Sequence, residues 1–137
     1  MSDPGEFPAV TKKVLSVGQC GYDDSRIGQV VRAALGVPLE RAHSGHEAKR
    51  LLAEKEYALI LVNRQFDAGG SGLELISELK EAGVATPVML VSDYAEAQAA
   101  ARAAGAVGGF GKSALGSEST RRVLREAVGV ADESMES

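Results

Sequence analysis

A chain of 137 residues with 45% hydrophobic and 25% charged residues has the size and composition of one globular domain, built without metal or disulfide support. Its formal net charge of −4 argues against a direct nucleic-acid partner, because such surfaces carry a basic excess. The chain shows no long apolar run and no secretion signal, and a single cysteine excludes an intramolecular disulfide, so the expected location is the cytoplasm with no membrane partner.

The first predicted elements are a strand and a helix joined by a turn. "KKVLSVGQ" predicts a strand that ends near Gly18. "CGYDDSR" has a turn-like composition, in which Cys20 is expected to be a small buried residue. Asp23 or Asp24 is expected to cap a helix that begins at Ser25.

The middle of the chain repeats this alternation. "VPLERA" predicts a weak strand whose Pro38 suits an edge strand or the start of a strand, and "SGHEAKRLLAEKE" predicts a helix. "ALILV" is the most apolar run and predicts a fully buried strand, which ends at the polar Asn63. "GSGLELISELKEAG" then predicts a third helix.

The last third contains two more strand–helix pairs. "TPVMLVS" predicts a buried strand that ends at Ser92, and "DYAEAQAAARAAG" predicts an alanine-rich helix. "AVGGFGK" predicts a short strand, weakened by its glycines, that ends at Lys112. "GSESTRRVLREAVG" predicts a helix capped by Ser117 or Ser119.

Five successive strand–helix pairs predict a parallel α/β sheet with helices on both of its faces. Sites in such sheets lie at the carboxyl ends of the strands. The residues expected at that edge are Gly18, Gln19, Asn63, Ser92 and Lys112. The predicted domain covers residues 12–128, between a flexible leader at 1–11 and a flexible acidic tail at 129–137.

Four segments in this order resemble the receiver domain of two-component response regulators. They are "AHSGHEAKRLLAEKEYALILVN", "SGLELISELK", "TPVMLVSD" and "GAVGGFGKS", and the resemblance spans residues 13–128. It implies a flavodoxin-like, doubly wound (βα)5 fold with strand order 2-1-3-4-5. It also implies a bacterial signalling protein that works in a phosphorelay.

The family's chemistry is phosphoryl transfer to an aspartate at the end of the third strand, with Mg²⁺ held by that aspartate and an acidic pair after the first strand. By position, the Ser/Thr and Lys that contact the phosphoryl group match Ser92 and Lys112. The acceptor position is Asn63, and the acidic pair falls on Gly18 and Gln19. The resemblance is therefore to an atypical receiver.

Those departures remove the chemistry on which the family depends. The amide of Asn63 has no anionic oxygen to attack phosphorus, and Gly18 and Gln19 offer no carboxylate to Mg²⁺. We therefore expect no cofactor, no phosphoryl transfer and no enzymatic activity. The Asn63 amide is expected to hydrogen-bond Ser92 or Lys112 and hold the pocket in one state.

Two alternatives remain open. A displaced acid would make the chain a phosphoaccepting regulator, with Asp67 as the first choice, followed by Asp23, Asp24 and Asp93. The ordinary interpretations are a turn residue for Asp67 and helix caps for the others. "AVGGFGKS" also fits a relaxed phosphate-binding loop, which suggests a small-anion or nucleotide sensor near Lys112; that pattern needs a strand before it and a helix directly after it.

The expected mode of action is binding to another signalling protein or an output domain, or homodimer formation. In the resembling family the fourth helix, fifth strand and fifth helix form the docking face. The aromatic switch position of the fifth strand falls on Gly109, with Phe110 one place later. The ordinary alternative for the arginines of the fifth helix, Arg121, Arg122 and Arg125, is a charged helix face exposed to solvent. The residues expected on the interaction face are Tyr94, Gln98, Arg102, Phe110, Arg121, Arg122 and Arg125.

Overall fold

The computed structural model describes residues 12–66 and 69–129 of the chain. The expected leader at 1–11, the tail beyond Gly129 and the candidate acid Asp67 lie outside the described residues. The strands are β1 (Val14–Val17), β2 (Leu39–Ala42), β3 (Leu59–Asn63), β4 (Val88–Val91) and β5 (Val107–Phe110). The helices are α1 (Gly21–Leu35), α2 (Gly45–Glu54), α3 (Gly72–Glu81), α4 (Ala95–Ala103), the 3-10 turn η1 (Lys112–Ala114) and α5 (Glu118–Ala127).

The five strands form one parallel sheet in the order β2-β1-β3-β4-β5, which confirms the predicted topology. β2 is an edge strand, as Pro38 directly before it suggests. The order reverses between β1 and β3, so the carboxyl ends of these two strands flank the switch point at which sites form in this architecture.

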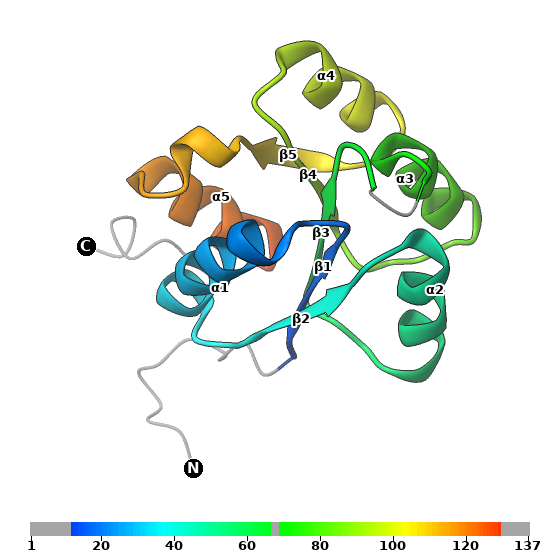
Figure 1. Ribbon diagram of the computed structural model, residues 1–137, viewed down its shortest axis with the longest axis horizontal. Helices are drawn as coiled ribbons and strands as arrows, with labels where there is room; N and C mark the ends of the chain where they lie inside the picture. The colour runs from blue at the N-terminus through cyan, green and yellow to red at the C-terminus, as the bar shows by residue number, and fades with distance from the viewer. Residues whose placement is uncertain (1–11, 67–68, 130–137) are drawn as a thin grey trace.

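Helices cover both faces of the sheet, with α1 and α5 on one side and α2, α3 and α4 on the other (Figure 1). The alternation of side chains along β3 explains the two layers. Leu59 and Leu61 belong to the cluster under α1 and α5, whereas Ile60 and Val62 belong to the opposite cluster. All four side chains are fully buried, as expected for a central parallel strand.

The start of α1 differs from the prediction. Cys20 is the N-cap residue, its Sγ accepts a hydrogen bond from the Asp23 backbone N–H at 3.4 Å, and its side chain is exposed rather than buried. The helix begins at Gly21, so Asp23 and Asp24 lie in its first turn and do not cap it. Gly18, with φ +80°, turns the chain directly from β1 into the helix, which leaves no room for the longer loop that we predicted.

The caps of the last two helices gave one confirmed and one wrong prediction. The Ser117 hydroxyl accepts from the Thr120 N–H at 3.2 Å and caps α5, as predicted. The residue at the cap of α4 is Tyr94, which makes no side-chain capping bond, so the prediction that Asp93 caps this helix is wrong.

Among the described residues, no helix is long and apolar enough to cross a membrane.

Candidate functional site

A cavity of about 400 Å³ lies at the carboxyl ends of β3 and β4. As predicted from strand order, it brings Asn63, Ser92 and Lys112 together. Gly18 and Gln19 do not line this cavity, although β1 lies beside β3. The full lining is Asn63, Arg64, Gln65, Val91, Ser92, Asp93, Tyr94 and Lys112.

The side chain of Asn63 is bonded to the backbone around it. Its Nδ2 donates to the carbonyl of Gly18 at 3.0 Å and to the carbonyl of Gln65 at 2.9 Å, while its Oδ1 accepts from the Arg64 N–H at 3.0 Å. The predicted bonds to Ser92 or Lys112 are therefore wrong. Two carbonyl oxygens face the amide nitrogen, a place where a carboxylate oxygen would be repelled. The amide thus ties the end of β1 to the segment after β3.

Phe66 fills the space beside Gly18. The phenyl ring is 8% exposed, and a Cβ on Gly18 would collide with it. Gly18 also has φ +80°, which strains any residue with a side chain. Phe66 was not among the predicted site residues, although an apolar residue within the polar stretch "NRQFDAGG" was the available signal. The position of the family's first acidic residue is therefore closed by an aromatic ring.

Gln19 adds no metal ligand. Gln19 is 4% exposed, and neither the nitrogen nor the oxygen of its side-chain amide has a hydrogen-bond partner among the described residues. In the part of the chain that the structure describes, no group of three or more His, Cys, Asp and Glu side chains is placed to hold a metal ion. Mg²⁺ prefers carboxylate oxygens, and at the positions of the family's acidic pair and acceptor it would meet a glycine, a buried neutral amide and the Asn63 amide. These residues do not fit the metal that the fold family implies.

Lys112 is neutralised by a displaced acid. Its Nζ lies 2.8 Å from Oδ2 of Asp23, which comes from the first turn of α1. The hydrogen bond from Lys112 is the main cause that holds the pKa of Asp23 below its usual value, against the opposing effect of partial burial. Asp23 therefore acts as the counter-ion of Lys112, a role that was not predicted from the sequence.

The other candidate acids are engaged elsewhere. Asp24 is 6% exposed and accepts from the hydroxyl of Ser16 at 2.6 Å and from Arg41, which joins α1 to β1 and β2. Burial raises the pKa of Asp24, while the bonds from Ser16 and Arg41 lower it. Asp93 accepts from the N–H and the hydroxyl of Ser113 at 3.2 and 2.7 Å, which ties the start of α4 to η1.

Ser92 and the loop around Lys112 are the remaining parts of the predicted site. The Ser92 hydroxyl accepts from the Tyr94 N–H at 3.2 Å. The phosphate-binding-loop interpretation near Lys112 does not match the structure, because β5 is followed by the short turn η1 and α5 begins only at Glu118. The long helix that the pattern requires directly after Lys112 is therefore not found in the described part of the chain.

The expected interaction face is only partly exposed. Phe110 is 6% exposed and belongs to the core, and Gln98 donates its amide to the carbonyls of Leu90, Ser92 and Phe110 at 3.0, 3.0 and 3.3 Å. Arg125 donates to the Ala34 carbonyl at the end of α1, at 3.3 Å. These three residues build the fold, so their assignment to the face is corrected. The residues that remain on it are Tyr94, Arg102, Arg121 and Arg122.

Gly109, at the position of the family's aromatic switch, is also restricted. A Cβ there would collide with the Leu90 carbonyl and the Gln98 amide. The β4–β5 register shifts between Met89 and Val91, where the two glycines of β5 lie. An aromatic side chain therefore has no room at this position.

No protein-family model matches the sequence, and no curated protein matches it. Solved receiver domains match the structure. The signal receiver domain of an HD domain-containing protein from Pseudomonas fluorescens Pf-5 has a TM-score of 0.74 and 19% identity, with 92% of this chain and 93% of that one covered. The beryllofluoride-activated NtrC4 receiver domain dimer has a TM-score of 0.73 and 20% identity, covering 87% and 98%.

The receiver domain of the Francisella response regulator 1452 has a TM-score of 0.67 and 21% identity, covering 87% of this chain and 98% of that one. At these identities the similarity establishes the fold. The chain has the receiver-domain fold, a flavodoxin-like five-stranded parallel sheet of order 2-1-3-4-5.

Proposed function

We propose that this protein is a phosphorylation-independent signalling module of a two-component-type pathway that acts by binding another protein. One observation carries the proposal. The Asn63 amide donates to the carbonyls of Gly18 and Gln65, at the position where the fold family places a nucleophilic carboxylate. An amide held in this way has no anionic oxygen to offer, so it forms no acyl phosphate.

The surroundings of Asn63 support the same conclusion. Phe66 blocks a side chain at Gly18, and Lys112 already has a carboxylate partner in Asp23. The lysine that would face a phosphoryl group is therefore already neutralised, and no carboxylate stands at Gly18 or Asn63 to hold Mg²⁺. The proposed module is therefore a fixed state, without enzymatic activity of its own.

A fixed state acts through the surface that it presents. Tyr94 is 56% exposed at the start of α4, and Arg102 is exposed on the same helix. Exposed aromatic and arginine side chains are frequent anchors in protein interfaces. We propose another signalling protein or an output domain as the partner, and a second copy of the chain as the alternative, since the similar NtrC4 receiver domain was solved as a dimer.

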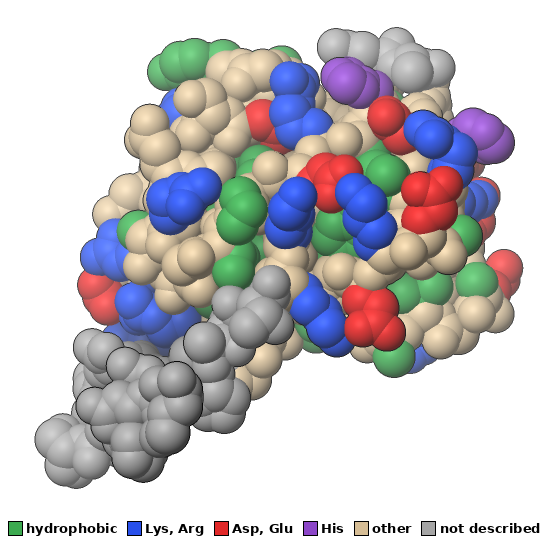
Figure 2. Space-filling view, turned by 90° about the horizontal axis from the view of Figure 1, so that it is seen from below, with side chains coloured by type: hydrophobic (Ala, Val, Ile, Leu, Met, Phe, Trp, Pro, Cys, Tyr) green, Lys and Arg blue, Asp and Glu red, His purple; other side chains and the backbone are tan. Residues whose placement is uncertain are grey.

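The surface gives no separate reason to propose nucleic acid. On the face shown in Figure 2, Lys and Arg side chains are interspersed with Asp and Glu and are not gathered into one basic patch. A phosphate backbone is usually met by a continuous basic surface. The proposal therefore stays with a protein partner.

The test is the intact mass of the full chain after incubation with Mg²⁺ and acetyl phosphate, beside a phosphoaccepting receiver as positive control. We expect no phosphoryl adduct and no change in melting temperature when Mg²⁺ is added. An acid-labile adduct would overturn the proposal. Peptide mapping would then identify the acceptor among Asp67, Asp23, Asp24 and Asp93.

A further inference from the structure

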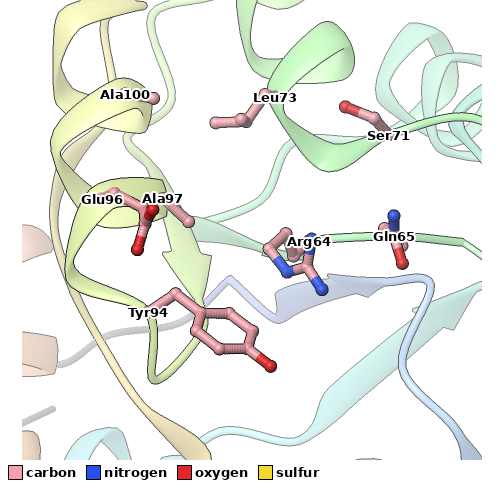
Figure 3. Close-up of a pocket in the computed structure, with 8 residues that line it drawn as sticks. All are labelled: Arg64, Gln65, Ser71, Leu73, Tyr94, Glu96, Ala97 and Ala100. Carbon is pink, nitrogen blue, oxygen red and sulfur yellow. The ribbon is translucent and has the colours of Figure 1, made fainter.

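A second cavity, of about 500 Å³, lies between α3 and α4. Figure 3 shows Leu73 of α3 facing Ala97 and Ala100 of α4 across it. This volume is in the range of small-molecule sites, which combine an apolar wall with a few polar groups. The polar groups here are Arg64, Gln65, Ser71, Tyr94 and Glu96.

Arg64 is held in place at one side of this cavity. Its guanidinium carbon lies 4.8 Å from the centre of the Tyr94 ring, within the range of a cation–π contact. Stacking uses the face of the guanidinium and leaves its N–H edges available for a carboxylate, which such an edge binds with two parallel hydrogen bonds. Among residues 12–66 and 69–129, Arg64 has no ion-pair partner.

Glu96 places the opposite charge on the same cavity. It belongs to the first turn of α4, and in Figure 3 Glu96 and Arg64 stand on either side of Ala97. Within the described segments Glu96 also lacks an ion-pair partner, so the two charges line one cavity without pairing with each other. Lys112 with Asp23 and Lys49 with Glu78 show the opposite arrangement, because in each case the two opposite charges form an ion pair within the protein.

We propose that this cavity binds a small zwitterion with an apolar group, the chemical class of the aliphatic α-amino acids. The ligand carboxylate would bond the Arg64 guanidinium, and its ammonium group would face the Glu96 carboxylate. Its apolar group would lie against Leu73, Ala97 and Ala100. A simple anion would meet the negative charge of Glu96, and a simple cation would meet Arg64, so the pair of charges favours a ligand that carries both.

The experiment is a titration of the isotope-labelled full chain with L-leucine, followed by amide chemical shifts. We expect saturable shifts at the cavity residues with a Kd on the order of 1 mM. Three analogues each lack one feature: 4-methylpentanoate lacks the ammonium group, leucinamide lacks the carboxylate, and glycine lacks the apolar group. Each should bind at least about tenfold more weakly, because it leaves one side of the site unmatched.

Substitutions in the chain separate this site from its surroundings. Arg64→Gln and Glu96→Gln should each weaken L-leucine binding about tenfold or more. The matched controls are Arg32→Gln on α1 and Glu126→Gln on α5, which carry the same charge changes on the other side of the sheet and should leave the Kd unchanged.

Three results would overturn the proposal: no saturable shifts, glycine binding as tightly as leucine, or an equal loss in the Arg32→Gln control. The site is independent of the proposed absence of phosphorylation. The two cavities share Arg64, Gln65 and Tyr94, but their tests have separate readouts: a phosphoryl adduct would overturn the proposed function, whereas failure of leucine to bind would overturn only this inference.

Discussion

The β4–β5 half of the pocket and its β1–β3 half match the pattern of the resembling receiver family to different degrees. In the first half, Ser92 and Lys112 match the residue types of the resembling family and line the cavity. In the second half, Gly18 and Asn63 stand where the resemblance places carboxylates; Phe66 fills the space beside Gly18, and backbone carbonyls accept from the Asn63 amide. The altered half is thus packed and bonded as part of the fold.

That difference is what the proposed loss of phosphoryl chemistry would require of a stable fold. Removing carboxylates leaves a lysine without a counter-charge and a polar strand end without partners, and both defects are costly when partly buried. Asp23 supplies the counter-charge, and the Asn63 amide supplies the partners. We therefore expect substitutions in the altered half to destabilise the fold more than substitutions in the retained half.

The largest effect is expected for Gly18→Ala. A side chain here must adopt φ +80° and also displace the Phe66 ring, and together these should lower the free energy of unfolding by about 3 kcal/mol in urea denaturation. Gly36→Ala is the matched control, because Gly36 has φ +76° but no atom near its missing Cβ, so only about 1 kcal/mol is expected.

A cycle with Phe66→Ala sharpens this comparison. In the Phe66→Ala background, Gly18→Ala should cost about as much as Gly36→Ala, since only the backbone strain remains. Equal losses for Gly18→Ala and Gly36→Ala in the native background would show that the ring does not close this position.

The next largest effect is expected for Asn63→Asp. The carboxylate loses both donated hydrogen bonds and faces the carbonyls of Gly18 and Gln65, so the free energy of unfolding should fall by about 2 kcal/mol at neutral pH. The substitution should not restore phosphorylation, because the metal ligands are missing as well. Urea denaturation and intact mass after acetyl phosphate treatment measure the two outcomes, and a phosphorylated Asn63→Asp protein would contradict our account of the pocket.

A smaller, pH-dependent effect is expected for Asp23→Asn. Lys112 lowers the pKa of Asp23 in the folded state, so the stabilisation is present above the unfolded pKa of about 3.9 and is lost as pH falls through the lower folded value. Near pH 6 the free energy of unfolding of the native chain should be about 1 kcal/mol higher than that of the variant. In acid the two free energies of unfolding should become equal. Denaturation from pH 6 downward checks this. A difference that stays constant with pH would mean that the carboxylate is not the source of the stabilisation.

The sequence was sufficient to predict the sheet, its order and the edge at which Asn63, Ser92 and Lys112 meet. The parallel sheet and the edge follow from apolar strands in strict alternation with helices and from the rule that parallel strands end together, whereas the strand order was implied by the resemblance to receiver domains. Pro38 indicated either an edge strand or the start of a strand, and the structure shows it directly before the edge strand β2.

The bonding inside the pocket could not be predicted in this way. The partners of Asn63 are backbone carbonyls, whose positions depend on the turn at Gly18 and not on residue type. Asp23 was assigned to a cap because the helix was expected to begin at Ser25, and its beginning at Gly21 moves the carboxylate toward Lys112. Phe66 was missed because its role depends on a contact 48 residues back along the chain, at Gly18.

The smallest effect is expected for Ser92→Ala, in the retained half. The hydroxyl accepts one hydrogen bond, from the Tyr94 N–H at the exposed start of α4, where water can take its place. We expect the free energy of unfolding to fall by about 0.5 kcal/mol, against about 2 kcal/mol for Asn63→Asp, when both are measured by urea denaturation under the same conditions. A loss for Ser92→Ala as large as that for Asn63→Asp would mean that both halves are bonded equally into the fold. The two halves of the pocket would then differ only in how well their residue types match the resembling family.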